Sequence, residues 1–404
     1  MDSVSQKTGP RAWLPLFAMA GAVFAFNSSE FMPIGLLTDI ATDFGISTSK
    51  AGLLITYYAW VVCVMSVPLM VLCSRMEYRK LLLATVALFA ASHVVSAVST
   101  SYAMLMASRV GVACAHSVFW AIAPPVAVKV APEGKRAVAL SVIAASTSVA
   151  LIAGLPLGRA IGLLLGWRST FGVVAAVAFA ILALIFWLFP KVPNTSFVAP
   201  AKIPGILKMP VLLGIFTVTA LTVTSQFCGY SYIEPFLKQT AGMPDAWVTW
   251  VLMLYGVAGI GASLLFSHFY EKSPKRFAVF AIGGIAASLL LLLPASHSIP
   301  AVIALCAFWG MAVMVFNLVF QSIVIDEAPP AALTIAMAAY SGIYNLGIGS
   351  GAFIGGRVES ALTVDYVGLA GFAVSILASA VFFLKLLPML KIGGRRTEAA
   401  TARH

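Results

Sequence analysis

The chain has 404 residues, of which 61% are hydrophobic and only 10% are charged, and its net charge is +11. An ordinary soluble domain has about 25% charged residues, so this composition excludes a soluble globular protein and indicates one that crosses the bilayer many times. The basic excess does not indicate nucleic acid, because the Lys and Arg residues fall almost wholly in short loops between apolar runs. In such loops they direct membrane topology.

Apolar segments long enough to cross a bilayer follow one another along the whole chain. A crossing takes about 20 apolar residues, and a backbone exposed to lipid must satisfy its own hydrogen bonds, so each segment should be an α-helix. The twelve predicted spans are residues 13–38, 50–73, 80–98, 102–128, 136–158, 168–189, 209–237, 246–268, 277–294, 299–325, 333–356 and 363–388.

The distribution of basic residues supports these spans. With both termini on the cytoplasmic side, 19 of the 25 Lys and Arg residues fall in inner segments. The outer side then holds Lys50, Arg159, Arg168, Lys238 and Arg357, and only Arg109 lies within a span. The positive-inside rule therefore supports twelve spans with both termini on the cytoplasmic side.

A proline-rich segment divides the spans into two sets of six. It holds prolines at positions 190, 193, 200, 204 and 210, as expected of a linker. We therefore predict a six-helix bundle at 1–189, a cytoplasmic linker at 190–208, and a second bundle with a short basic tail at 209–404. The predicted fold class is all-α integral membrane, with twelve transmembrane helices in two pseudo-symmetric bundles. Such repeats imply a substrate site near the midplane between the halves.

Three ionisable residues, Glu30, Arg109 and His116, lie inside predicted spans. A charge facing lipid costs about 2.5 to 3.5 kcal/mol on insertion scales, so intramembrane charges usually face a bundle interior and mark ion or substrate pathways. The helical rise places Glu30 about 12 Å and Arg109 about 10 Å from the outer ends of their spans. The two could therefore share a network. Glu30 and His116 are candidates for a proton switch tuned by Arg109; the alternative is a static polar network that fixes helix packing, with Arg109 a structural counter-ion.

Polar side chains in later spans are candidates for substrate contact. Gln226, Tyr230 and Glu234 occur at i, i+4 and i+8 and predict one stripe on span 7, although Glu234 is near enough to the outer end to be exposed to solvent. Asn345 lies about 18 Å deep in span 11, among glycines that favour close helix packing. The further candidates for substrate contact are Asn27, Ser341 and Tyr344.

Aromatic residues in several spans could stack on a ligand, or instead pack or face lipid. Together with amides and tyrosines they suit a neutral hydroxylated ligand or an amphipathic drug, and they do not select between the two. The aromatic candidates are Tyr57, Tyr58, Trp60, Trp120, Trp309 and Phe316.

The chain resembles the major facilitator superfamily, in particular its proton-coupled sugar-efflux group near the drug/proton antiporters. The resemblance covers the whole chain. The stretches that carry it are Phe26–Leu36, Tyr58–Trp60, Ser108–His116, Gly154–Arg159, Tyr230–Pro235 and Ser341–Gly347.

The resemblance implies roles for several of these motifs. Arg109 and Gly111 match the proton-relay motif of span 4, and Gly154, Pro156 and Gly158 resemble the antiporter motif of span 5. The loop motif that locks the family's conformations is only partly present. Arg79 and Lys80 match it, but Arg75 stands where an Asp is expected and Tyr78 where a Gly is expected; the second copy retains Glu271 and Lys272.

We therefore predict a proton-coupled antiporter that exports sugars or sugar-like glycosides by alternating access, with multidrug efflux as the close alternative. It is expected to be a multi-pass protein of the bacterial inner membrane. Its expected partners are a small-molecule sugar or glycoside, protons and the lipid bilayer, without nucleic acid. It is expected to be a monomer with no cofactor and no metal, driven by the proton gradient. An integral-membrane enzyme is disfavoured because no H-E-x-x-H or G-x-S-x-G motif occurs, and a passive channel because of the intramembrane Glu30.

Overall fold

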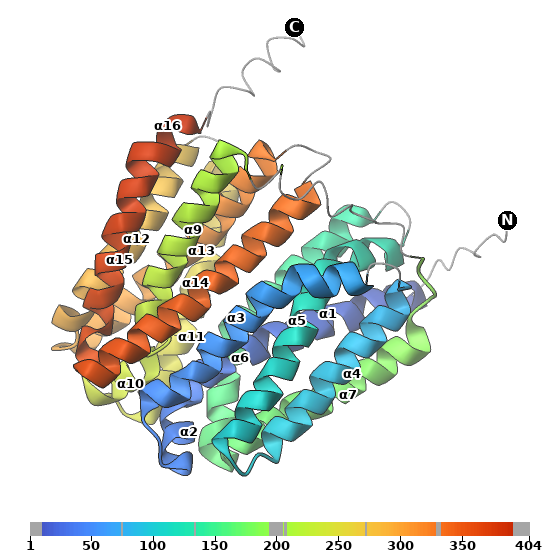
Figure 1. Cartoon of the computed structure of the whole chain (residues 1–404), viewed down its shortest axis with the longest axis horizontal. Helices are drawn as coiled ribbons and strands as arrows, with labels where there is room; N and C mark the ends of the chain where they lie inside the picture. Colours follow the sequence, from blue (N-terminus) through green and yellow to red (C-terminus); the bar gives the residue numbers. More distant parts are fainter. Residues whose placement is uncertain are drawn as a thin grey trace, which may run out of the picture. The chain divides into compact units, whose positions relative to one another are not determined.

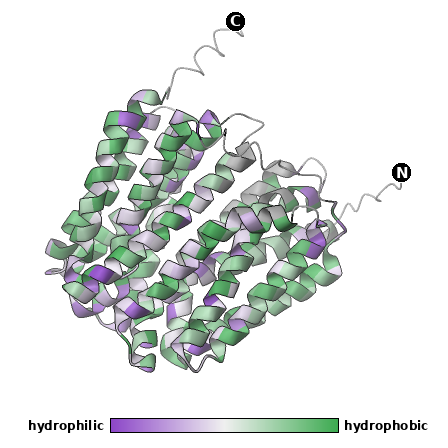
Figure 2. Cartoon of the chain, viewed as in Figure 1, coloured by the Kyte–Doolittle hydropathy of each residue, from purple (hydrophilic) through white to green (hydrophobic). Residues whose placement is uncertain are grey.

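The computed structural model of the chain describes residues 10–73, 76–132, 135–193, 205, 208–270, 273–328 and 333–390. Every regular element among these residues is helical, and apolar residues cover most of the helical surfaces (Figure 2). The prediction of an all-α protein is confirmed.

The first half of the chain contains the helices that correspond to predicted spans 1 to 6 (Figure 1). Two short 3₁₀ segments, η1 (Pro10–Trp13) and η2 (Met32–Leu36), flank the first of them. The α-helices are α1 (Leu14–Phe31), α2 (Leu37–Phe44), α3 (Thr48–Cys73), α4 (Tyr78–Ala97), α5 (Tyr102–Val130), α6 (Arg136–Leu165) and α7 (Trp167–Leu188).

The second half contains the helices that correspond to spans 7 to 12 (Figure 1). They are α9 (Pro210–Tyr230), α10 (Ile233–Gln239), α11 (Asp245–Phe269), α12 (Pro274–Ala295), α13 (Ile299–Glu327), α14 (Leu333–Ala361), η6 (Val364–Tyr366), α15 (Val367–Val381), the π-helical segment η7 (Phe382–Leu386) and α16 (Leu387–Met389).

Each predicted span contains a helix, but spans 1 and 7 are not the continuous helices that we expected. Span 1 changes to a 3₁₀ segment at Met32, next to Pro33, and span 7 is divided after Tyr230, ahead of Pro235. A proline lacks an N–H and its ring clashes with the carbonyl of the residue four positions earlier. Proline therefore accounts for the end of α9, because the residue four before Pro235 is Ser231.

Nine helical segments in the described part are long and apolar enough to cross a membrane. They are Thr48–Ser66, Tyr78–Ala97, Tyr102–Ala123, Trp167–Leu188, Pro210–Gln239, Asp245–Phe266, Pro274–Ala295, Ile299–Glu327 and Val364–Met389.

The chain forms two compact units. Unit 1 comprises Met1–Leu36 and Val64–Val198, and unit 2 comprises Leu37–Cys63 and Ala199–His404. Leu37–Cys63 thus groups with the second unit, although the proline-rich segment suggested a division at 190–208. Most of that segment lies outside the described residues, so the predicted bundle boundaries stay a prediction.

Hydrogen bonds explain why Leu37–Cys63 belongs to unit 2. The hydroxyl of Thr48 donates to the carboxylate of Glu359 on α14, and the hydroxyl of Ser360 bonds to that of Ser49 at 2.6 Å. The Trp60 ring lies 5.6 Å from that of Phe353. The first turns of α3 are therefore attached to α14 by polar and aromatic contacts.

Within unit 2, α14 and α9 pack closely because a glycine faces the partner helix. A Cβ atom at Gly351 would lie 2.4 Å from the carbonyl oxygen of Thr224, which is closer than real Cβ atoms come. Small residues permit such close approach between membrane helices. The predicted packing role of the span 11 glycines is confirmed at this position.

Gly351→Ala should lower the stability of the protein by about 1–3 kcal/mol, because the added methyl group overpacks the contact between α14 and α9. Thermal unfolding of the purified protein in detergent measures the effect. Gly342→Ala, in the same helix but with nothing within 4 Å of its Cβ position, is the matched control and should leave the midpoint unchanged. Equal midpoints for the two variants would contradict this account of the packing.

Candidate functional site

An acid and a histidine from two helices meet inside unit 1. Glu30 lies at the end of α1 and His116 in the middle of α5, and the distance between Glu30 Oε2 and His116 Nε2 is 3.7 Å. Only 8% and 3% of the respective residues' surface is exposed. The structure therefore brings together two of the three ionisable residues that the sequence singled out.

The third, Arg109, binds the backbone beside Glu30. It is fully buried and lies seven residues before His116, so both point from roughly the same face of α5. Its Nη1 atom donates a hydrogen bond of 3.2 Å to the carbonyl oxygen of Ser29. Arg109 thus places a positive charge at the backbone of the residue that precedes Glu30.

A second histidine completes the group. The hydroxyl of Ser29 bonds to His93 Nε2 on α4 at 2.7 Å, and His93 is fully buried. Sequence reasoning missed His93, although an ionisable residue inside predicted span 3 was the same signal that identified His116. We call these residues the α1–α4–α5 cluster: Ser29, Glu30, His93, Arg109 and His116.

Aromatic rings surround the cluster. Phe26, one turn before Glu30, stacks on Phe89 at 3.9 Å and on Phe119 at 4.0 Å between ring centroids. The half-buried Trp120 ring lies 6.1 Å from that of His116. Apolar walls lower the local dielectric constant and strengthen electrostatic interactions. A change of charge within the cluster therefore affects its neighbours strongly.

The antiporter-like motif of α6 packs directly on the α1 segment that carries Glu30. A Cβ at Gly154 would lie 2.8 Å from the Cα atom of Ser28, and one at Gly158 would lie 2.5 Å from Cγ of Met32. Pro156, between them, is buried as well. The motif thus holds the residues on both sides of Glu30 against α6.

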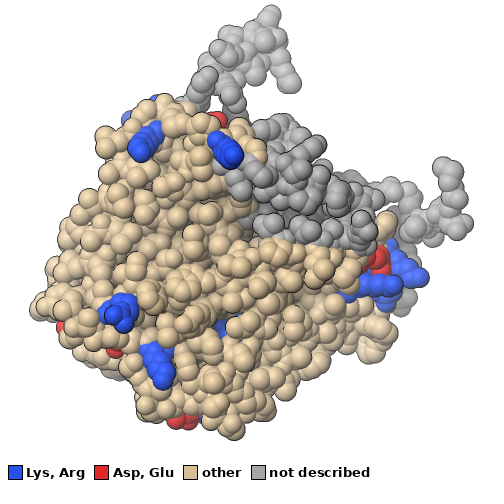
Figure 3. Space-filling model, in the orientation of Figure 1, with Lys and Arg blue, Asp and Glu red and all other residues tan. Residues whose placement is uncertain are grey.

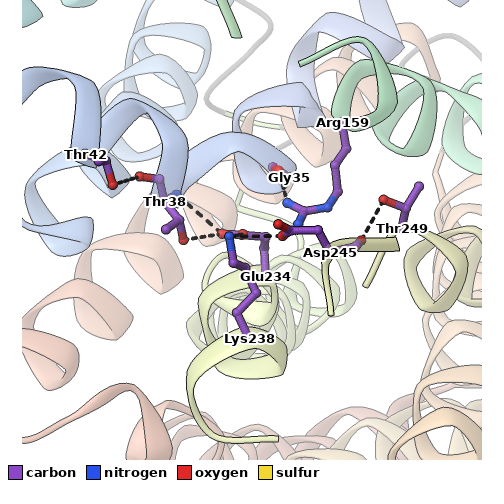
Figure 4. Close-up of polar contacts among 8 residues, drawn as sticks. All are labelled: Gly35, Thr38, Thr42, Arg159, Glu234, Lys238, Asp245 and Thr249. Atoms are coloured by element: carbon purple, nitrogen blue, oxygen red, sulfur yellow. Dashed lines mark hydrogen bonds and ion pairs between the residues drawn. The ribbon is translucent and has the colours of Figure 1, made fainter. Parts of the chain in front are cut away.

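Arg159, which follows this motif, has a structural role that topology alone did not indicate. The sequence placed it among the charges of the outer side, but its side chain is fully buried. Its Nη1 atom donates to the carbonyl oxygen of Gly35 at 2.6 Å (Figure 4). Arg159 therefore binds the 3₁₀ segment η2, where the backbone hydrogen bonds of α1 have ended.

An aromatic cluster lies in unit 2. Tyr230 stacks on Tyr255 with 4.7 Å between centroids, and Trp309 meets both rings edge to face at 5.9 Å. Gln226 donates from Nε2 to the Tyr255 hydroxyl at 3.2 Å. Sequence reasoning identified Gln226, Tyr230 and Trp309 as candidates but missed Tyr255. We call these four residues the unit 2 aromatic cluster.

Two buried polar atoms of this cluster have no hydrogen-bond partner among the described residues. They are Oε1 of Gln226 and the indole Nε1 of Trp309. Buried polar groups are normally satisfied by protein or water. One acceptor and one donor beside stacked rings can bind a hydroxylated or amphipathic small molecule.

Glu234 does not extend the stripe of Gln226 and Tyr230, because the helix is interrupted before Pro235. On α10 the Glu234 carboxylate accepts from the hydroxyl of Thr38 at 2.7 Å and lies 3.6 Å from Lys238 Nζ (Figure 4). The alternative prediction, that Glu234 is exposed to solvent, is wrong, since the residue is fully buried. Lys238 also contacts Asp245 at 3.0 Å, so Glu234 belongs to a charged network at this end of unit 2.

The two candidate asparagines use their amide hydrogens within their own helices. Asn27 donates to the carbonyl of Val23 at 3.2 Å, and Asn345 donates to that of Ser341 at 3.0 Å. Asn345 Oδ1 is buried and has no hydrogen-bond partner among the described residues. Tyr344, one residue earlier, is half-buried. On α14 a buried acceptor therefore directly follows a half-buried tyrosine in the sequence.

The remaining candidates differ in their surroundings. Ser341 is exposed. On α3, Tyr57 is 44% exposed, whereas Tyr58 is buried. At the start of α4 the half-buried Arg79 donates to the carbonyl oxygen of Phe186 on α7, and Lys80 is exposed. Glu271 lies outside the described residues.

Known proteins resemble this chain in sequence and in fold. The sequence of this chain matches that of the Major Facilitator Superfamily over residues 17–352 and 215–402. A protein of Pasteurella multocida (strain Pm70), described as "Probable sugar efflux transporter", is 42% identical over 368 residues, which cover 91% of this chain and 90% of that protein.

Two solved structures share the fold at low sequence identity. A bacterial homolog of the human lysosomal transporter Spinster, in an inward-facing and unoccupied conformation, has a TM-score of 0.74 at 15% identity, covering 94% of this chain and 98% of the other. A mutant of the peptide transporter POT in complex with alafosfalin has a TM-score of 0.76 at 13% identity, covering 94% of each chain. These likenesses confirm the predicted fold, and the sequence matches extend over nearly the whole chain. The chain therefore belongs to the Major Facilitator Superfamily and is a membrane transporter of that family rather than an enzyme.

Proposed function

We propose that this transporter is a proton-coupled antiporter that exports sugars or sugar-like glycosides across the bacterial inner membrane by alternating access. The observation that carries the proton part is the contact of 3.7 Å between Glu30 and His116 in a buried cluster. The sugar part is supported by the 42% identity with a relative described as a probable sugar efflux transporter.

The α1–α4–α5 cluster has the groups that a proton carrier needs. A carboxylate and an imidazole can each take up and release a proton, and they lie close enough for the charge of one to affect the other. Arg109, bound to the backbone of Ser29, adds a positive charge beside this pair. Protonation of Glu30 removes its attraction to Arg109, which can shift the balance between two conformations.

Coupling follows if substrate and proton favour opposite conformations. In the proposal, a hydroxylated substrate contacts His116 and Trp120 from unit 1, so that it competes with Glu30 for the same imidazole. Asn27 is a further candidate contact on unit 1. The candidates on unit 2, each considered within that unit, are Tyr58, Tyr344, Asn345 and the unit 2 aromatic cluster. A ligand shifts an equilibrium only through its different affinities for the two states, and competition at His116 provides such a difference.

Multidrug/proton efflux is the second candidate, and one observation favours it. The stacked rings of Tyr230 and Tyr255 and the edge of Trp309 suit a flat aromatic or cationic molecule as well as a sugar ring. The two candidates share the proton site and differ only in the ligand.

Glu30→Gln should abolish the dependence of export on an imposed pH gradient, because glutamine cannot exchange a proton. The measurement is transport of a radiolabelled glycoside in proteoliposomes with and without the gradient. Asp326→Asn, which alters an exposed acid on α13, is the control and should transport like the wild type. Wild-type transport that is indifferent to the gradient would refute antiport. Gradient-driven transport by Glu30→Gln would show that the proton site lies elsewhere.

The hydrogen bond between Ser29 and His93 holds α4 against α1 beside Glu30. Ser29→Ala should lower stability by about 1–3 kcal/mol, because it leaves a buried imidazole nitrogen without its partner. Ser146→Ala is the control, since the hydroxyl of Ser146 donates to the carbonyl of Val142 in its own helix. In a double-mutant cycle, His93→Phe should remove most of the effect of Ser29→Ala. The measurement is thermal unfolding. Additive effects of the two substitutions on stability would contradict the proposed link between α4 and α1.

Gln226→Leu should weaken sugar or glycoside binding by about two- to tenfold, because it removes the Oε1 acceptor of the unit 2 aromatic cluster. The measurement is a binding titration of purified protein with sugars, glycosides and lipophilic cationic drugs. Gln239→Leu, at an exposed position on α10, should bind like the wild type. If only the lipophilic cations bind, the sugar assignment fails and multidrug efflux replaces it.

A further inference from the structure

An apolar groove runs between α4 and α7 on unit 1, away from the polar residues of the candidate site. Its volume is about 670 Å³, and all of the side chains that line it are apolar or aromatic. The smallest side chains that line it are alanines from both helices, which we call its floor, and the largest are aromatic residues of α7, which we call its walls. These residues are Ala84, Ala87 and Ala183, and Phe179, Phe186 and Trp187.

The groove has the dimensions of a lipid tail. From Phe179 to Trp187 the helix rises about 12 Å, slightly less than half of the hydrocarbon core of about 30 Å. The three wall residues are strongly exposed, with 76% of the surface of Trp187 accessible. Both helices are long and apolar enough to cross the membrane. Such a surface suits the hydrocarbon region, and the length of the groove is close to the depth of one leaflet.

A guanidinium group lies at one end of this groove. Arg79 Nη2 donates to the carbonyl oxygen of Phe186 at 2.5 Å, and its Cζ atom lies 5.9 Å from the centre of the Phe186 ring. Its Nε atom is buried and has no hydrogen-bond partner among the described residues. Lys80, the next residue, is exposed. Because Phe186 is also a wall residue, the positive charge lies directly at the mouth of the groove.

The surrounding charges strengthen this positive end. Basic side chains gather where α4 begins and α7 ends, at the right of Figure 3. Lys191 is exposed there, and Lys129 lies 4.8 Å from the centre of the Tyr78 ring. The acid among the described residues of this region is Glu77, which accepts a hydrogen bond of 2.7 Å from the backbone of Val192. Positive charge therefore exceeds negative charge at the mouth.

We propose that the groove binds an anionic phospholipid, with its phosphate on Arg79 and Lys80 and one acyl chain between α4 and α7. The basic loops predict that this end of α4 lies at the cytoplasmic face, where anionic lipids attract Lys and Arg. The indole of Trp187 suits the boundary between headgroups and tails. A zwitterionic lipid fits the same groove without the net charge, and a free phosphate lacks the chain.

Native mass spectrometry of the purified full-length protein tests the charge requirement. It compares phosphatidylglycerol and phosphatidylcholine with identical acyl chains, and phosphatidylglycerol should be retained preferentially. Arg79→Gln with Lys80→Gln should weaken its binding about fivefold for each basic residue removed. The matched control is Lys275→Gln with Arg276→Gln, two exposed basic residues at the start of α12, and it should retain wild-type binding.

A second variant tests the groove without changing any charge. Ala84→Leu with Ala87→Leu fills the floor and should reduce phosphatidylglycerol binding while the unfolding temperature stays that of the wild type. Equal retention of the two lipids by the wild type would overturn the proposal. So would an equal loss in the α12 control, or full binding by the filled groove.

Discussion

The contact between Glu30 and His116 is the interaction on which the account of unit 1 depends. An ionisable carboxylate in a membrane helix is costly unless its surroundings stabilise the charge. In this protein those surroundings come from neighbouring helices: α5 supplies His116 and Arg109, and α4 supplies His93 through Ser29. The electrostatics of Glu30 therefore depend on how α1 packs against α4 and α5. A change in the charge of Glu30 in turn alters the forces between these helices.

The opposite side of α1 is constrained by α6. Gly154 and Gly158 allow α6 to approach the residues on both sides of Glu30, and Arg159 binds the backbone of Gly35, where α1 has given way to η2. Helix α1 thus has a charged side, which carries the Glu30 carboxylate, and a closely packed side, which contacts α6. In the proposed mechanism the antiporter-like motif on α6 has a physical role, because a shift of α1 that follows protonation of Glu30 changes the contacts of α1 with α6.

Much of this arrangement could be predicted from the sequence, because a charge in an apolar segment is conspicuous. Glu30, Arg109 and His116 stood out for that reason, and the helical rise placed Glu30 and Arg109 at similar depths. His93 carried the same signal and was overlooked. Its link to Ser29 could not be predicted, since which helices touch depends on tertiary packing. The role of Tyr255 could not be predicted either, because in the sequence it is one aromatic residue in an apolar span. Its partners come from α9 and α13, and only tertiary packing brings them together. The interruption of span 7 was predictable from Pro235, and it explains why Glu234 contacts Thr38 and Lys238 rather than extending the stripe.

The central claim is that substrate and proton compete through Glu30 and His116, and proton release on ligand binding tests it most directly. Purified protein in weakly buffered detergent solution is titrated with a glycoside while the pH is recorded. The account predicts that the wild type releases protons as the ligand binds and that Glu30→Gln binds the ligand without releasing them. Binding by the wild type without any proton release, or equal release from the Glu30→Gln variant, would contradict it.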